Sequence, residues 1–122
     1  MNNKENAVSF LEMAARGNVS EAYSKFVGFD FRHHNAFFEG TAQALQAGME
    51  ENAGQNPTKV FEIKRVIAEG DLVVTHSHVR QKPGDLGAAV VHIFRFENGK
   101  IVELWDLGQP IPAESINKNG MF

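Results

Sequence analysis

The hydrophobic pattern of the chain changes its period at one point, the Asn56-Pro57 step, and this change limits the folds that the chain can adopt. Before this step, apolar residues recur at the spacing of amphipathic helices, and after it they alternate with polar residues as in strands. A residue that precedes proline is driven out of the helical region, so we expect the last helix to end here. Helices followed by strands predict an α+β domain, with the helices packed on one face of a sheet.

Three helices are expected in the first half of the chain. The first covers residues 8–15 and ends before Gly17, because glycine is the preferred residue just past a helix end. The second begins with Ser20 as its N-cap and stops at Gly28. The third begins at Thr41, whose hydroxyl also suits an N-cap.

The second half predicts an antiparallel sheet. Four strands are expected, at about 59–68, 71–80, 88–96 and 100–108. Asn98-Gly99 joins the last two and is typical of a type I′ hairpin turn. The stretch "FDFRHHNAFF", between the second and third helices, is expected to form a short edge strand. We therefore expect residues 1–122 to form one α+β domain, a curved antiparallel sheet packed against three N-terminal helices.

The composition argues against several classes of function. With a net charge of −3 and no cluster of Lys and Arg, the chain is not expected to bind nucleic acid or an anionic membrane. There is no cysteine, which removes disulfides, thiolate metal sites and thiol nucleophiles. The first residues contain charges and no long apolar stretch, so we expect neither a signal peptide nor a membrane span, and a cytoplasmic location. Ten phenylalanines predict an apolar core or pocket.

Two histidines in "VVTHSHVR" raise the question of a functional site. His76 and His78 are two residues apart, so on a strand they share one face. If the chain turns at "AEGD" with the first and last of these residues paired, Ile63 lies opposite His76 and Phe61 opposite His78. This register predicts that both imidazoles face the apolar side of the sheet.

The following hairpins decide whether other polar groups join these histidines. Pairing Arg80 with Ala88 places His92 opposite His76, so that three imidazoles share one apolar surface. Strict alternation beyond Asn98-Gly99 then places Asp106 on the opposite face. A site shared by His92 and Asp106 therefore requires a β-bulge in the last hairpin, and without it Asp106 is a strand-end or interface carboxylate.

The opposite face of the sheet is also apolar. Val91, Ile93, Val102 and Leu104 lie on it, and three short helices cannot cover both faces. A homodimer joined through the sheet is the expected way to cover this face.

Three blocks of the chain resemble a known family: "RVIAEGDLVVTHSHV", "PGDLGAAVVHIFRFENGKIVELWDLGQP" and "NGMF". They are similar to the SnoaL-like polyketide cyclase family within the nuclear-transport-factor-2-like superfamily, over about residues 20–122. The resemblance implies a cone-shaped fold with an internal pocket. In the cyclases a histidine on the penultimate strand and an aspartate fourteen positions later line this pocket, and the aspartate is the acid/base of an intramolecular aldol ring closure. His92 and Asp106 have this spacing in the matching context "HIFRFENGKIVELWD".

The chain also departs from many relatives of this family. Those relatives carry Asp at the position of His92, His at that of Leu104 and Pro at that of Ala36. The resemblance therefore predicts the fold and the pocket more closely than the reaction.

The resemblance implies an enzyme that acts on a hydrophobic carbonyl substrate by acid/base chemistry and needs no cofactor. Asp106 is expected to be the acid/base, with His92 and His76 as hydrogen-bond donors to substrate oxygens. The expected substrate-binding side chains are His34, His78, Phe31, Phe94 and Trp105. Isomerisation or hydration in the same cone is an alternative, and a ligand-binding or assembly module without turnover is another.

More ordinary roles for these residues stay open. Asp106 can be a structural carboxylate and His92 a hydrogen-bonded core residue. A metal site built from the three histidines with Asp106 or Glu103 is a further alternative, but the apolar surroundings offer no clear second shell, so no metal is expected. The C-terminal "NKNGMF" is expected to fold back over the pocket mouth or a partner subunit.

Overall fold

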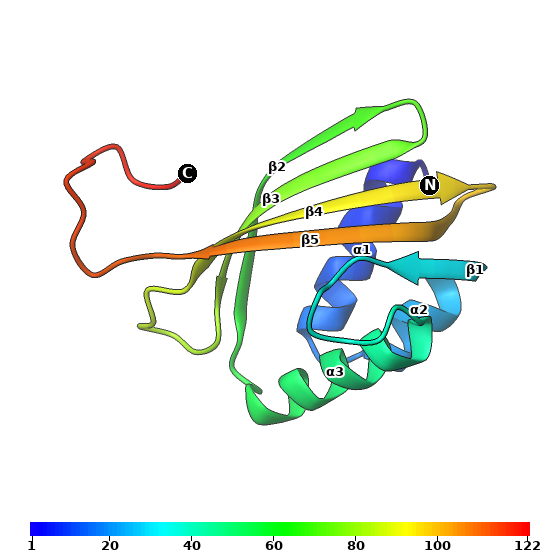
Figure 1. The fold of residues 1–122 in the computed structure, drawn as a ribbon, viewed down its shortest axis with the longest axis horizontal. Helices are drawn as coiled ribbons and strands as arrows, with labels where there is room; N and C mark the ends of the chain where they lie inside the picture. The colour runs from blue at the N-terminus through cyan, green and yellow to red at the C-terminus, as the bar shows by residue number, and fades with distance from the viewer.

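The computed structural model describes residues 1–122 as three helices and one curved five-stranded sheet (Figure 1). The helices are α1 (Asn3–Ala15), α2 (Val19–Phe26) and α3 (Ala42–Gln55). The strands are β1 (Val27–His33), β2 (Val60–Glu69), β3 (Leu72–Arg80), β4 (Ala88–Glu97) and β5 (Lys100–Pro110). The strands lie in the order β1-β5-β4-β3-β2, and all three helices lie on the same side of the sheet. We call the face toward the helices the inner face and the opposite face the outer face. The expected α+β architecture is confirmed.

The ends of the helices follow local capping chemistry. The Thr41 side chain accepts a hydrogen bond from the backbone N–H of Ala44, as predicted for the start of α3. The predicted limits of α2 are wrong. The helix starts with Val19, because this side chain is fully buried in the core, and Gly28 belongs to the following strand.

β1 is the edge strand expected from "FDFRHHNAFF", and it runs parallel to β5. Every other pair of neighbouring strands is antiparallel. A parallel edge strand needs a long return connection. Here the chain between β1 and β5 contains α3 and the three strands β2, β3 and β4, and α3 lies on the β1 side of the molecule (Figure 1).

The predicted register of the β2–β3 hairpin is wrong by two residues next to the turn. Glu69 pairs with Leu72 across a two-residue turn, in which Gly70 has a φ of 59°. A left-handed glycine suits a two-residue hairpin turn, and the expected pairing of Ala68 with Asp71 also encloses two residues, so the turn has the expected length but lies one residue farther along the chain. Farther along, the register shifts between Ile63 and Arg65. A displacement of two residues keeps the predicted faces, but the shift between Ile63 and Arg65 adds one residue to β2, so Ile63 and Phe61 no longer share a face with His76 and His78.

His76 and His78 consequently lie on the outer face. His76 pairs with Arg65 and His78 with Glu62, whereas Ile63 pairs with Ser77. The neighbouring hairpin is also displaced, since Val79 rather than Arg80 pairs with Ala88. The expectation that His76 and His78 point into an apolar interior is therefore wrong.

The β4–β5 hairpin contains the bulge that a shared site requires. Glu97 pairs with Lys100 around Asn98-Gly99, and both turn residues have positive φ, as the type I′ turn predicts. Phe96 then pairs with Ile101, but Arg95 pairs with Glu103, so Val102 is an extra residue on β5. From this point His92 pairs with Asp106, and both side chains lie on the inner face.

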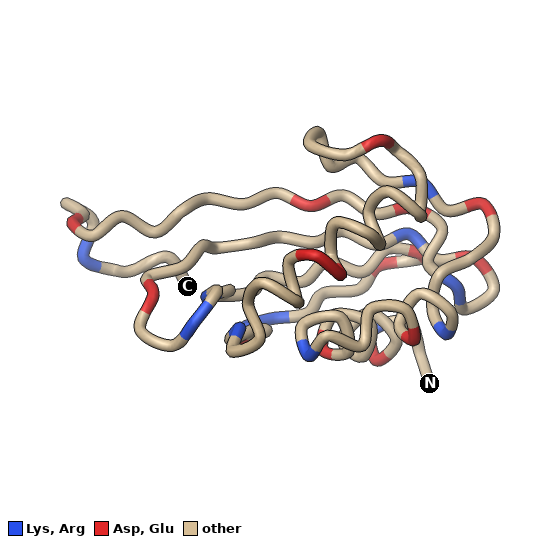
Figure 2. Tube along the Cα trace, turned by 90° about the horizontal axis from the view of Figure 1, so that it is seen from below, with Lys and Arg blue, Asp and Glu red and all other residues tan.

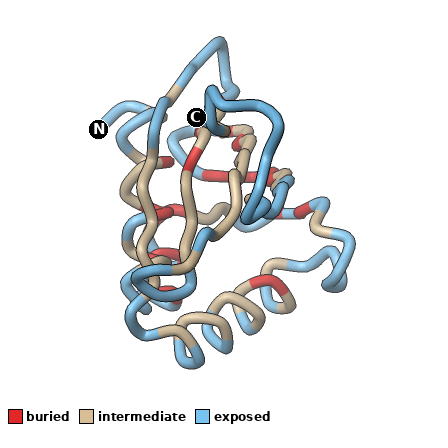
Figure 3. Tube along the Cα trace, turned by 90° about the vertical axis from the view of Figure 1, so that its left-hand side faces the viewer, coloured by how far each residue is buried: buried red, intermediate tan, exposed pale blue.

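The core lies between α1, α2 and the inner face. Its largest fully buried side chains include Phe10 of α1, Phe94 of β4 and Ile101 of β5. α3 contributes far less, since Leu45 is its only buried residue. Figure 3 shows this difference, with α3 largely intermediate or exposed along its length. The incomplete packing beneath α3 leaves space for a pocket.

Charged residues of both signs are interspersed along the chain (Figure 2). None of the helices combines the length and the apolar character that a membrane-spanning helix needs.

Replacing the N-cap of α3 should loosen the helix that lies over this space. We expect Thr41→Ala to lower the free energy of unfolding by about 1 kcal/mol, because the N–H of Ala44 loses its acceptor. Chemical denaturation measures this change. Thr58→Ala is the matched control, because Thr58 is exposed in the turn after α3. Equal effects of the two substitutions would contradict the capping role.

Candidate functional site

A pocket of about 360 Å³ lies between the helices and the inner face of the sheet. Its walls are largely apolar and include Phe10 and Leu11 of α1 and Phe61 of β2. Its polar lining residues include Asn35, Asn52, Lys59, His92 and Asp106. An apolar cavity with a few converging polar groups is the usual form of a small-molecule site.

His92 and Asp106 form a cross-strand pair at this pocket. They are directly opposite each other on β4 and β5. The Nδ1 atom of His92 is buried and has no hydrogen-bond partner. A buried polar atom without a partner is unfavourable in a folded protein, and the His92 ring, which lines the pocket, makes no hydrogen bond within the protein that would compete with a ligand.

The environment keeps the His92 ring neutral at pH 7. Burial lowers the pKa of His92 to about 4. The negative charge of Asp106 raises this pKa, and the positive charge of Lys59 lowers it. A neutral imidazole has one N–H donor and one acceptor nitrogen. His92 can therefore donate to one ligand atom and accept from another.

Asp106 is held by the loop after β1. The Nδ2 atom of Asn35 donates to Oδ2 of Asp106 over 3.0 Å. The backbone N–H of Asn35 donates to Nδ1 of His33 over 3.0 Å, so the buried His33 ring donates through Nε2 to the carbonyl oxygen of Glu39, 2.6 Å away. His33 is thus a support for the loop that presents Asn35. The sequence contained no signal for this arrangement, because the loop closes against β5 only in the folded chain.

Two further groups near the pair were not identified from the sequence. The hydroxyl of Tyr23 donates to Sδ of Met49 over 3.1 Å. Burial raises the pKa of Tyr23, and the negative charges of Asp106 and Glu50 raise it further. The Nζ atom of Lys59 donates to Oδ1 of Asn52. Burial lowers the pKa of Lys59. Lys59 directly follows the Asn56-Pro57-Thr58 turn, which is the one sequence signal that could have drawn attention to it.

The outer-face histidines belong to a different environment. Nε2 of His78 donates to the carbonyl oxygen of Leu86 over 2.8 Å, and Nδ1 of His76 contacts the guanidinium of Arg65. The Phe122 ring lies 4.7 Å from the His78 ring and 5.3 Å from the His76 ring, between centroids. The C-terminal segment does fold back as expected, but onto the outer face and away from the pocket.

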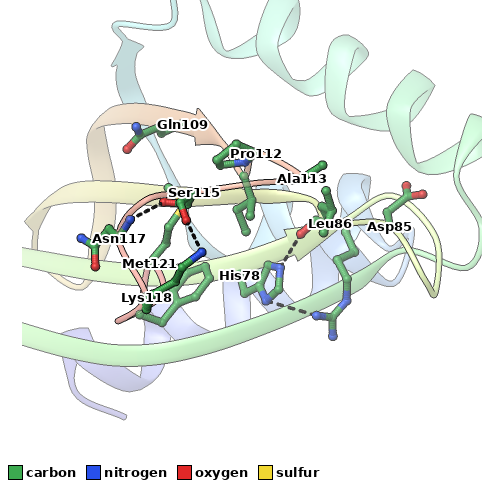
Figure 4. Close-up of a pocket in the computed structure, with 14 residues that line it drawn as sticks. His78, Asp85, Leu86, Gln109, Pro112, Ala113, Ser115, Asn117, Lys118 and Met121 are labelled. Atoms are coloured by element: carbon green, nitrogen blue, oxygen red, sulfur yellow. Dashed lines mark hydrogen bonds between the residues drawn. The ribbon is translucent and has the colours of Figure 1, made fainter.

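This segment encloses an open hollow of about 790 Å³ on the outer side (Figure 4). Figure 4 shows His78 at its base, bonded to the Leu86 carbonyl, with Ser115, Lys118 and Met121 of the tail around it. His78, Ser115 and Lys118 are already hydrogen-bonded within the protein. The inner pocket is the stronger candidate because its polar groups include a buried, unpartnered nitrogen.

His34 and Trp105 also lie outside the pocket. Their rings stack at 4.9 Å, and Nε2 of His34 donates to Oε2 of Glu103 over 2.6 Å. Arg95 and Arg32 also donate to the buried Glu103 carboxylate, over 3.0 and 3.1 Å. The hydrogen bond from His34, with those from the two arginines, lowers the pKa of Glu103 to about 2. This cluster joins β1, β4 and β5 and serves the sheet rather than the pocket.

The two remaining predicted residues, Phe31 and Phe94, are buried core side chains that do not line the pocket. Of the eight predicted site residues, His92 and Asp106 alone line it. The three-histidine metal site considered from the sequence is not formed, because His92 is on the inner face and His76 and His78 are on the outer face.

Comparison with known families gives a match over most of the chain. The model of the SnoaL-like domain matches residues 7–104. A search of curated proteins gives no match.

Several solved structures have the same fold. AclR from Streptomyces galilaeus, described as a candidate hydroxylase, is 24% identical, with a TM-score of 0.75 over 88% of this chain and 79% of its own. A nuclear-transport-factor-2-like protein of unknown function from Burkholderia xenovorans LB400 is 23% identical, with a TM-score of 0.74 over 93% of this chain and 86% of its own. A candidate isomerase of the SnoaL-like family from Agrobacterium tumefaciens is 14% identical, with a TM-score of 0.72 over 89% of this chain and 99% of its own. At these identities the likeness establishes the fold alone.

The lowered pKa of His92 predicts a pH dependence of stability. The unfolded ring has a pKa near 6.5 and the folded ring near 4, so the unfolded state binds more protons between these values. Stability should therefore fall as the pH drops from 6.5 to 4, and His92→Gln should flatten this part of the profile.

Glu103 predicts a second pH dependence of stability, at lower pH than that of His92. Its folded pKa of about 2 lies below its ordinary value of 4.5, so its contribution is present above pH 4.5 and is lost as the pH falls toward 2. Glu103→Gln should flatten only this lower window. Chemical denaturation at a series of pH values measures both, and an unchanged slope between pH 6.5 and 4 in His92→Gln would contradict the neutral, buried state of His92.

Proposed function

The chain belongs to the SnoaL-like domain family, and from this membership and the geometry of the pocket we propose that it catalyses cofactor-free acid/base chemistry on a hydrophobic carbonyl compound. The observation that carries the proposal is the pairing of Asp106 with a neutral His92, whose buried Nδ1 has no partner. Apolar walls suit a hydrophobic ligand, and the pair supplies both a carboxylate and a neutral hydrogen-bonding ring.

In the proposed reaction the Asp106 carboxylate removes a proton from the carbon next to a substrate carbonyl, which leaves an enolate. The ring N–H of His92 donates a hydrogen bond to the enolate oxygen as its negative charge develops. The enolate carbon attacks a second carbonyl carbon of the same molecule, which forms a carbon–carbon bond and an alkoxide. The protonated Asp106 then returns its proton to the alkoxide, so the carboxylate is regenerated.

Asn35 has a positioning role in this scheme. Its amide donates to Oδ2 of Asp106, which leaves Oδ1 free to face the substrate. The amide also supplies no proton of its own, so Asp106 remains the group that exchanges protons with the substrate. His33 acts one step farther away, because it holds the backbone of Asn35.

The first step can be tested before the product is known. We expect the protein to accelerate the exchange of α-protons of 4-phenyl-2-butanone for deuterium in D₂O, followed by proton NMR. Asp106→Asn should lower the exchange rate by about 10²–10⁴-fold, because an amide cannot accept the proton. Asp71→Asn is the matched control, since Asp71 is exposed in the β2–β3 turn.

Two results would contradict this assignment. Equal exchange rates in the wild type and Asp106→Asn would remove Asp106 from the reaction. Binding of the ketone without any exchange above the buffer rate would instead indicate a ligand-binding module.

We also propose that two copies of the chain associate through their outer faces. Val91, Ile93 and Trp105 lie on this face without a covering helix, and Leu107 is 61% exposed. A stable interface buries roughly 800 Å² on each partner, which a sheet face of this kind can supply.

Charged residues at the centre of this face should separate the two copies. We expect the wild type to be a dimer by light scattering after gel filtration, and Val91→Glu with Leu107→Glu to be a monomer, because two buried unpaired carboxylates oppose association. Ile116→Glu is the control, because Ile116 is fully exposed in the C-terminal segment. A monomeric wild type would refute the proposed dimer.

A further inference from the structure

Lys59 is the only lysine or arginine that lines the inner pocket. It lies at the end of the turn that follows α3, where its backbone N–H donates to the carbonyl oxygen of Asn56 over 3.2 Å. Its side chain reaches Asn52, a pocket residue of α3. The turn that ends the helix thus brings an ammonium group to the pocket wall.

The ammonium of Lys59 and the carboxylate of Asp106 line one apolar pocket without forming an ion pair. Each is bonded to a neutral amide, Lys59 to Asn52 and Asp106 to Asn35. The ring of His92 is influenced by both charges, so all three groups share one electrostatic environment. Burial lowers the pKa of Lys59, and no carboxylate opposes this effect.

A partly buried ammonium without an anionic partner is an unfavourable arrangement. A bound anion would relieve it, whereas a neutral ligand would remove still more water from the charge. The negative charge of Asp106 repels an anion that lies beside it. The two charges therefore favour one orientation for a ligand with an anionic end.

From this arrangement, and resting on the proposed function, we infer that the substrate is a carbonyl compound that also carries a carboxylate, which the Lys59 ammonium binds. The reacting carbonyl then lies toward Asp106 and His92, and the apolar body of the molecule lies against Phe10 and Phe61. A cavity of about 360 Å³ is small enough for one ligand to contact both Lys59 and Asp106. Lys59 is in this view the residue that determines specificity for organic acids.

Two unreactive probes of nearly equal shape test this inference: 4-phenylbutanoate and its neutral amide, 4-phenylbutanamide. Isothermal titration calorimetry should show that the wild type binds the acid at least about tenfold more tightly than the amide, as expected for a charge-assisted hydrogen bond. Lys59→Met should remove this preference and keep the affinity for the amide, which also reports an intact pocket. Lys59→Arg should retain the preference because the positive charge remains.

Lys64→Met is the matched control, because Lys64 is an exposed residue of β2 bonded to Glu62, and it should leave both affinities unchanged. Equal binding of the two probes by the wild type, binding of neither, or a preference that survives Lys59→Met would overturn the inference. The inference about Lys59 and the catalytic proposal can be rejected independently of each other. A preference for the acid without α-proton exchange rejects the catalytic proposal alone, and exchange without the preference rejects the role of Lys59 alone.

Discussion

The candidate site depends on one extra residue in β5. Val102 is left without a partner between the pairs Phe96–Ile101 and Arg95–Glu103, and the side chains beyond it change face relative to a regular hairpin. Without this bulge Asp106 would point to the outer face, where the sheet carries its ion clusters and exposed apolar side chains. With it, Asp106 lies opposite His92 beneath the helices. The bulge is therefore the feature that joins the two residues into one site.

The polar groups on the two faces of the sheet differ in how many of their hydrogen bonds are made within the protein. On the outer face, Glu103 is surrounded by His34, Arg32 and Arg95, and its hydrogen-bonding capacity is used within the protein. On the inner face, His92 has a buried nitrogen without a partner, and Asp106 and Lys59 are bonded only to amides. Clusters whose polar groups all have hydrogen-bond partners stabilise a fold. Polar groups in an apolar cavity that lack such partners remain available to a ligand. This contrast, more than the presence of histidines, distinguishes the inner pocket from the rest of the surface.

The errors in the predicted site follow from register. The run "VVTHSHVR" correctly indicated that His76 and His78 share a face, because alternation is a local property of a strand. Which face they share depended on the extra residue of β2 between Ile63 and Arg65, which places Ile63 opposite Ser77 rather than opposite a histidine. His34 was misplaced because β1 pairs with β5 from a distant part of the chain, and Trp105 because the bulge that brings Asp106 to the inner face pairs Trp105 with Ile93 on the outer face. Alternation already placed His92 on the apolar face, and Asp106 could join it there only through a bulge, which the family resemblance favoured.

The sequence by itself determined the helices, the strands, the end of α3 at Asn56 and the Asn98-Gly99 turn. These features depend on backbone preferences and on periodicities that extend over a few residues. Only the tertiary structure decided which side chains meet: Asn35 with Asp106, Lys59 with Asn52, and Phe122 with His78. Such contacts join residues that are far apart in the chain, or, as for Lys59 and Asn52, residues on the two sides of a turn whose geometry must be known. Their geometry is set by strand register and by helix packing, which no local pattern in the chain specifies.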